Sequence, residues 1–182
     1  AVKALRFQGK TPLSAPLLQA AEALRHTEAS ATVVLVTDGI ETCAAELRAL
    51  LPPEGSVPLA LNLHPQSLLD NSFRHTLLMA LLRLGKRRAA SLVIELNEGL
   101  VHRYLDALRA PLRELRLFGC QLAVDHAGQD VVSTHYIKEF ELAYLKIHPS
   151  LVRDIARRPL NQLAVRSLAG GCGAQAPVLA GG

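Results

Sequence analysis

The sequence predicts an α/β fold in which repeated strand–helix units build a parallel sheet. Three observations support this fold class. Short apolar runs rich in valine and isoleucine alternate with longer amphipathic segments of helical period. The short runs are almost continuously hydrophobic, which is typical of strands that are covered on both faces. The connections between them are short, which favours right-handed crossovers between parallel strands.

Seven apolar runs are predicted to form strands. In chain order they are a weak run at Val2–Phe7 and stronger runs at Val33–Val36, Leu59–Leu63, Leu92–Leu96, Leu122–Val124, Tyr144–Ile147 and Pro177–Leu179. Six or seven parallel strands suit either an open doubly wound sheet or an incomplete barrel. A complete eight-stranded barrel typically needs about 250 residues, and this chain has 182.

Four amphipathic segments between these runs are predicted to be helices. They are Leu13–Leu24, Ser67–Leu84, Val101–Leu117 and Ser150–Leu168. The first follows Thr11-Pro12, a capping residue with proline at the first helical position. The second ends before Gly85, a residue suited to a helix C-cap. Pro111 is expected to kink or split the third helix, and Pro159 to mark a break in the fourth.

Composition places the chain among ordinary globular proteins. Hydrophobic residues make up 49% and charged residues 20%, which excludes a disordered, collagen-like or disulfide-dense chain. No apolar run reaches the roughly 18 to 20 residues of a membrane helix. The net charge is +4, and residues 56–182 carry +5 of charge against −1 for residues 1–55. This imbalance indicates either acidic partners or a solvated basic face.

Polar or ionisable residues follow most of the predicted strands. They include Asp38, Asn62, Glu95, Asp125-His126 and Lys146-Ile147-His148. Because the carboxyl ends of parallel strands meet at one edge of a sheet, we expect these side chains to line a common mouth. Glu95 lies inside an apolar strand, and a buried carboxylate costs several kcal/mol unless it is paired. The sequence therefore predicts a present or ancestral site at this edge.

Residues from about 56 to 182 resemble the EAL domain, the barrel that hydrolyses cyclic di-GMP. Leu59–Leu63 is similar to the family's "VNLS" strand, Ser91–Glu98 to "LVFEITE", Gln121–Gly128 to "RLALDDFG", Tyr144–His148 to "YLKID" and Ala176–Gly182 to the start of "VVAEGVE". The five motifs occur in the family's order and spacing. The resemblance implies a partial TIM barrel in this part of the chain.

The departures from the family pattern imply a vestigial site. The resemblance carries the family's asparagine, glutamate, aspartate and lysine over to Asn62, Glu95, Asp125 and Lys146. Three family carboxylates are replaced here, by His126, His148 and Gly181, and the strand that carries Glu-Ala-Leu is absent. Two-metal phosphodiester hydrolysis needs many fixed oxygen ligands. We therefore expect no catalytic residues, no bound metal and no phosphodiesterase activity.

The replacements follow those of degenerate EAL domains of the CsrD type. The similar segments are Val124–Gly128, Leu145–Arg153, Asn161–Leu163 and Val165–Leu168. Proteins of this type are membrane-anchored regulators of RNase E-dependent small-RNA decay. The resemblance implies a non-catalytic, cytoplasmic regulatory module that binds a protein partner. Residual cyclic di-GMP binding or hydrolysis is the alternative, and direct contact with RNA or with a membrane is not expected.

Residues 1–50 resemble the second half of a von Willebrand factor A domain. Gly9–Leu13 and Val33–Cys43 carry the likeness, and it assigns Thr11 and Asp38 to a vestigial Mg²⁺ site. The family's third ligand loop is missing, so we expect no cofactor. We predict two units, a Rossmann-like A-domain fragment at 1–55 and the EAL-like fragment at 56–182, which share one core. An engineered chimeric fold with no selected function is a further hypothesis.

Two other clusters each have two interpretations. His126 and His148, near Glu95 and Asp125 in the expected mouth, would suit a softer metal such as Zn²⁺, or are hydrogen-bonded residues of an inactive site. The basic run Arg83, Lys86, Arg87 and Arg88 compensates a helix dipole, or contacts phosphate.

Overall fold

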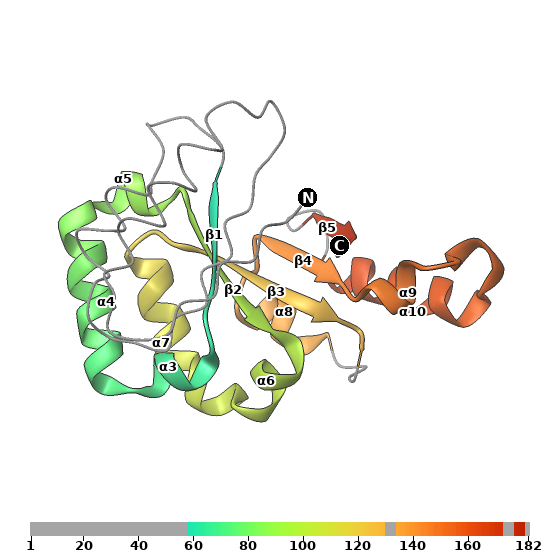
Figure 1. The fold of residues 1–182 in the computed structure, drawn as a ribbon, viewed down its shortest axis with the longest axis horizontal. Helices are drawn as coiled ribbons and strands as arrows, with labels where there is room; N and C mark the ends of the chain where they lie inside the picture. Colours follow the sequence, from blue (N-terminus) through green and yellow to red (C-terminus); the bar gives the residue numbers. More distant parts are fainter. Residues whose placement is uncertain (1–57, 130–133, 173–176, 181–182) are drawn as a thin grey trace, which may run out of the picture.

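The computed structural model describes residues 58–129, 134–172 and 177–180. Within these residues five strands form one parallel sheet, in the order β1-β2-β3-β4-β5 (Figure 1). The strands are β1 (Leu59–Asn62), β2 (Leu92–Asn97), β3 (Gln121–Ala127), β4 (Tyr144–Ile147) and β5 (Val178–Ala180). The α/β class and the five strands predicted in this part of the chain are confirmed. The sequential order matches a barrel, because the strand order of a doubly wound sheet reverses.

Helices connect successive strands, and one helical segment near the end of the chain extends beyond the sheet (Figure 1). They are α3 (Pro65–Leu69), α4 (Asn71–Leu84), α5 (Lys86–Ala89), α6 (Glu98–Arg103), α7 (Leu105–Leu117), α8 (His135–Glu139), α9 (Pro149–Val152), the 3₁₀ helix η1 (Ile155–Arg157) and α10 (Pro159–Cys172). Among the described helices, none is both long and apolar enough to cross a membrane.

Three of the predicted helices are divided at places that differ from the prediction. The segment at 150–168 is divided at Arg153, between α9 and η1. The segment predicted as one helix over 67–84 is divided at Asp70, whose Oδ1 accepts the Phe73 N–H at 2.7 Å and starts α4. The segment at 101–117 is divided at Tyr104, and α7 runs through Pro111. Proline removes one backbone hydrogen bond, and the burial of Leu112 and its apolar neighbours on α7 against the core offsets that loss. The predicted break at Pro159 and the C-cap at Gly85 are confirmed.

The sheet separates two apolar layers. One face carries Leu61, Ile94, Val124 and other branched residues, which pack with the helices into the main core. The opposite face carries a small cluster of Ala60, Val93 and Ala123, with Tyr144 packed against it. Because side chains alternate along a strand, the residues two positions after Ala60, Val93 and Ala123 lie on that second face as well.

The predicted elements at Val2–Phe7, Leu13–Leu24 and Val33–Val36 lie outside the described residues. The same holds for Thr11 and Asp38 of the predicted A-domain metal site and for Gly181. The division into units at 1–55 and 56–182 therefore stays a prediction.

Arg109 and Glu139 join α7 to α8, and this ion pair predicts an acid-dependent loss of stability. Arg109 Nε donates to Glu139 Oε1, and this hydrogen bond lowers the pKa of Glu139. A carboxyl whose folded pKa lies below its unfolded value stabilises the fold above the unfolded pKa, and that contribution is lost as the pH falls through the folded pKa. We expect Glu139→Gln to flatten the decline in free energy of unfolding between pH 6 and pH 3, measured by urea titration. An unchanged decline in the variant would contradict the assignment.

Candidate functional site

The carboxyl ends of β1, β2 and β4 bring three polar side chains together on the second face of the sheet. The Lys146 Nζ atom lies 2.5 Å from Glu95 Oε1, and the Asn62 Nδ2 atom donates to Glu95 Oε2 at 3.3 Å. Asn62 and Glu95 are direct register partners of β1 and β2. Glu95 is 3% exposed, so its carboxylate is buried, and both of its oxygens have a donor. The pairing expected for a buried carboxylate is present.

Ala123 allows the Glu95–Lys146 contact across an intervening strand. Glu95 is on β2 and Lys146 on β4, and β3 lies between them. The β3 residue in register with Glu95 is Ala123, whose side chain ends at Cβ. This small side chain leaves room above β3 on the face that carries Glu95.

A second group forms where β3 departs from regular pairing. The β3–β4 register shifts between Val124 and Ala127, and His126 adopts a positive φ of 60° there. The backbone N–H of His126 donates to Asp125 Oδ1 at 2.7 Å, and its ring Nδ1 lies 3.2 Å from Asp125 Oδ2. A left-handed conformation is uncommon for a residue other than glycine. The irregularity and the Asp125 carboxylate together orient the His126 ring.

His148 lies beside His126 and also starts a helix. The two ring centroids are 5.4 Å apart, with planes tilted by 43°. The Nδ1 atom of His148 accepts the Ser150 N–H at 3.2 Å and lies 2.7 Å from Ser150 Oγ, which makes it the N-cap of α9. Accepting a backbone N–H requires an unprotonated Nδ1, which leaves the proton of a neutral ring on Nε2. An Nε2–H group is a donor and has no lone pair for a metal.

The predicted site residues thus form two groups. Asn62, Glu95 and Lys146 make one, and Asp125, His126 and His148 make the other. Within the described ranges, no three or more His, Cys, Asp or Glu groups are placed to hold a metal ion. The Glu95 oxygens already accept from an ammonium and an amide, so the residues described here do not fit the divalent cations that the fold family uses. The Zn²⁺ interpretation of the histidines gains no support.

Sequence reasoning missed a buried carboxylate beside this edge. Glu98, at the start of α6, is 1% exposed; its Oε2 accepts the Gly128 N–H at 2.6 Å, and its Oε1 accepts the Tyr136 hydroxyl. Tyr136 is on α8. Its ring meets the His102 ring edge to face, with the two ring centroids 4.9 Å apart. Burial, followed by the bond with Glu98, raises the pKa of Tyr136, so its hydroxyl stays a donor. The sequence signal for Glu98 was its position as the last residue of the Ser91–Glu98 motif.

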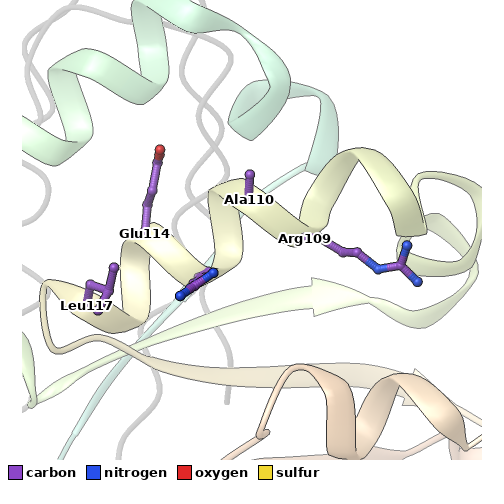
Figure 2. Close-up of a pocket in the computed structure, with 5 residues that line it drawn as sticks. Arg109, Ala110, Glu114 and Leu117 are labelled. Atoms are coloured by element: carbon purple, nitrogen blue, oxygen red, sulfur yellow. The ribbon is translucent and has the colours of Figure 1, made fainter.

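A hollow on the outer surface of α7 is a weaker candidate (Figure 2). Its described lining comes from that one helix: Arg109, Ala110, Arg113, Glu114 and Leu117. In Figure 2 the Arg109 and Glu114 side chains point in different directions, so the polar groups of the described lining do not converge. Arg109 pairs with Glu139, and Glu114 lies 3.6 Å from Arg74. These ion pairs join α7 to the neighbouring helices α8 and α4. The strand-end groups therefore remain the candidate site.

The sequence model of the EAL domain family matches residues 14–182. The RNase E specificity factor CsrD of Escherichia coli (strain K12) is 37% identical over 114 residues, which are 63% of this chain and 18% of that protein. The cyclic di-GMP phosphodiesterase PdeA of Borreliella burgdorferi is 25% identical over 137 residues, 75% of this chain and 20% of that one.

Solved structures agree on the fold. Klebsiella pneumoniae BlrP1, in a complex with calcium and cyclic di-GMP, superposes with a TM-score of 0.60 at 29% identity, over 74% of this chain and 34% of BlrP1. Vibrio cholerae LapD, without ligand, gives a TM-score of 0.60 at 22% identity, over 69% of this chain and 31% of LapD. The chain thus spans about a fifth of the curated relatives and about a third of these structures.

The family match begins at residue 14 and runs through most of the segment predicted to resemble a von Willebrand factor A domain. None of these findings shows an A-domain fragment. That likeness and the hypothesis of a chimera stay predictions.

Proposed function

Because the chain belongs to the EAL domain family, we propose that it is a regulatory EAL domain that binds a protein partner and does not hydrolyse cyclic di-GMP. The likeness to CsrD at 37% identity supports the regulatory role. The named relatives include a phosphodiesterase as well as a specificity factor, so the choice between the two activities depends on the residues at the strand ends.

The Glu95–Lys146 ion pair carries the proposal. A divalent cation bound to Glu95 would compete for its oxygens with Lys146 and Asn62, whose donors lie 2.5 Å and 3.3 Å away. Displacing Lys146 would leave a cation with 22% side-chain exposure next to the incoming metal. Two positive charges at such short range repel each other. The pair therefore favours a metal-free site.

The two histidines support the same choice. His126 and His148 stand where the family motifs have carboxylates. Each is committed to a local structural contact, His126 with Asp125 and His148 with the first turn of α9. Hard cations such as Mg²⁺ prefer oxygen ligands. A site with these replacements has too few of them to activate a water for attack on phosphorus.

Cyclic di-GMP binding without hydrolysis is the second candidate function. BlrP1 is described in a complex with that ligand. Here the side chain of His126 is 47% exposed beside His148, and the Nε2–H group of a neutral His148 ring is a hydrogen-bond donor for a phosphate oxygen. A protein with this function would bind the ligand of the family, cyclic di-GMP, without hydrolysing it.

We expect no conversion of cyclic di-GMP to the linear dinucleotide when the chain is incubated with the nucleotide and Mg²⁺ or Mn²⁺. Liquid chromatography measures the product, and calorimetry measures binding with and without metal. Glu95→Gln is the test variant, and Asp106→Asn, an exposed carboxylate on α7, is the matched control. Turnover that is lost in Glu95→Gln and kept in Asp106→Asn would overturn the proposal. Metal-independent binding without turnover would favour the second candidate.

A further inference from the structure

The segment from α9 to α10 is held together as one unit. Asn161 Nδ2 donates to Ser150 O at 2.9 Å, and Gln162 Nε2 donates to Ile155 O at 2.9 Å. These side chains fasten the backbone of α9 and η1 to the first turn of α10. Leu168 and Cys172, further along α10, are buried. The segment therefore has a defined shape and extends beyond the end of the sheet (Figure 1).

The side of α10 that lies away from the buried Leu168 and Cys172 exposes two leucines to solvent. Leu160 is 80% exposed and Leu163 is 65% exposed. They are three residues apart and so lie next to each other on the helix surface. Burial of a leucine side chain away from water is favourable. Two adjacent exposed leucines therefore offer a binding partner a favourable apolar contact.

Four arginines flank this apolar pair in the sequence. Arg153, Arg157, Arg158 and Arg166 are all exposed, and Asp154 is the one acidic residue between Pro149 and Cys172. Among the described residues, none of the four arginines forms an ion pair with a carboxylate. Arg166 follows Leu163 by one helical turn. We call Leu160, Leu163 and these four arginines the α10 surface.

We propose that the α10 surface is a docking site for a protein whose own surface is acidic around an apolar centre. Carboxylates would meet the four arginines, and apolar side chains would cover Leu160 and Leu163. The inference rests on the proposed function, because it names the surface and the partner chemistry of the protein-binding module.

The charge of the α10 surface argues against two other occupants. A symmetric dimer places the same patch against itself, which would bring four arginines of one copy against four of the other. Membrane-surface helices bury a broad apolar face, often with aromatic residues. Here the exposed large hydrophobic residues of α10 are two leucines, and the helix has no aromatic residue. An acidic protein surface satisfies both the charge and the small apolar area.

The test uses a synthetic helical peptide with two leucines flanked by four glutamates, and a matched peptide with lysines in place of the glutamates. Fluorescence anisotropy with the full chain measures both affinities at 50 and 300 mM salt. We expect the acidic peptide to bind at least tenfold more tightly than the basic one, and to weaken at high salt. Arg157→Glu/Arg158→Glu and Leu160→Asp/Leu163→Asp should each reduce the affinity at least tenfold. Leu117→Asp, at a leucine that is also 65% exposed, is the control and should have no effect.

Each alternative occupant has its own arm in the experiment. Equal binding of both peptides, or binding that both α10 variants keep, would overturn the inference. So would concentration-dependent dimerisation, or binding to vesicles with anionic headgroups, if Leu160→Asp/Leu163→Asp abolishes it. Circular dichroism melts of the variants exclude unfolding as the cause. Failure of this test without cyclic di-GMP turnover leaves the proposed function intact with a different surface, whereas turnover defeats the proposed function by itself.

Discussion

Glu98→Ala is expected to lower the free energy of unfolding by about 3 kcal/mol. The wild-type carboxylate is buried and accepts from the Gly128 N–H and the Tyr136 hydroxyl. Removing it leaves both donors without their acceptor inside the fold, and it leaves a cavity where the side chain was. Urea denaturation followed by circular dichroism measures the change.

Two milder variants separate the contributions to that loss. Tyr136→Phe removes one donor and keeps the carboxylate with Gly128, so we expect a loss of about 1 kcal/mol. Glu98→Gln keeps an acceptor oxygen and the side-chain volume, and it should fall between the other two. If Glu98→Ala were no more destabilising than Tyr136→Phe, the Gly128 hydrogen bond would contribute nothing, and the anchoring role assigned to Glu98 would be wrong.

Gly128→Ala is expected to cost about 2 to 3 kcal/mol. Gly128 follows β3 with φ +83°, a conformation that L-residues rarely adopt. A Cβ added there would lie 2.5 Å from Leu151 Cδ1 and 2.9 Å from Leu168 Cδ1. Backbone strain and steric overlap therefore add up. The same urea titration reports the loss.

The chain supplies a matched glycine control. Gly170 lies in α10, and a Cβ placed there would meet nothing within 4 Å. Gly170→Ala should be neutral or stabilise the fold by up to about 1 kcal/mol, because alanine is the better helix former. A Leu151→Ala background should relieve part of the overlap in Gly128→Ala and leave the strain from φ. Equal effects at Gly128 and Gly170 would contradict the close packing of the loop after β3.

The predicted strands were accurate because their signal is local. Leu92–Leu96 and Tyr144–Ile147 are apolar runs, and burial of both faces requires such runs. Helix boundaries were less accurate where side-chain capping decides them. Asp70 starts a new helix through one hydrogen bond to Phe73, and the period of the apolar residues does not change there. The five-residue helix α8 was not predicted because it is too short to show a period.

The strand-end residues were predictable as a set, and their partners were not. Periodicity and position placed Glu95 and Lys146 at the same edge of the sheet. Their contact across β3 depends on the register of three strands. Glu98 was missed because a carboxylate just after a strand resembles an ordinary helix start, where acidic residues are common.

The sequence by itself determined the α/β class, the described strands and the edge at which polar residues gather, since hydrophobic runs and strand ends are properties of short segments. The tertiary structure alone decided which charges neutralise each other. It paired Glu95 with Lys146, and it buried Glu98 where its carboxylate accepts hydrogen bonds from Gly128 and Tyr136. Such pairs join residues about 30 to 50 positions apart in the chain, and their energies depend on burial and on separations of a few ångströms, which arise only once the sheet has formed.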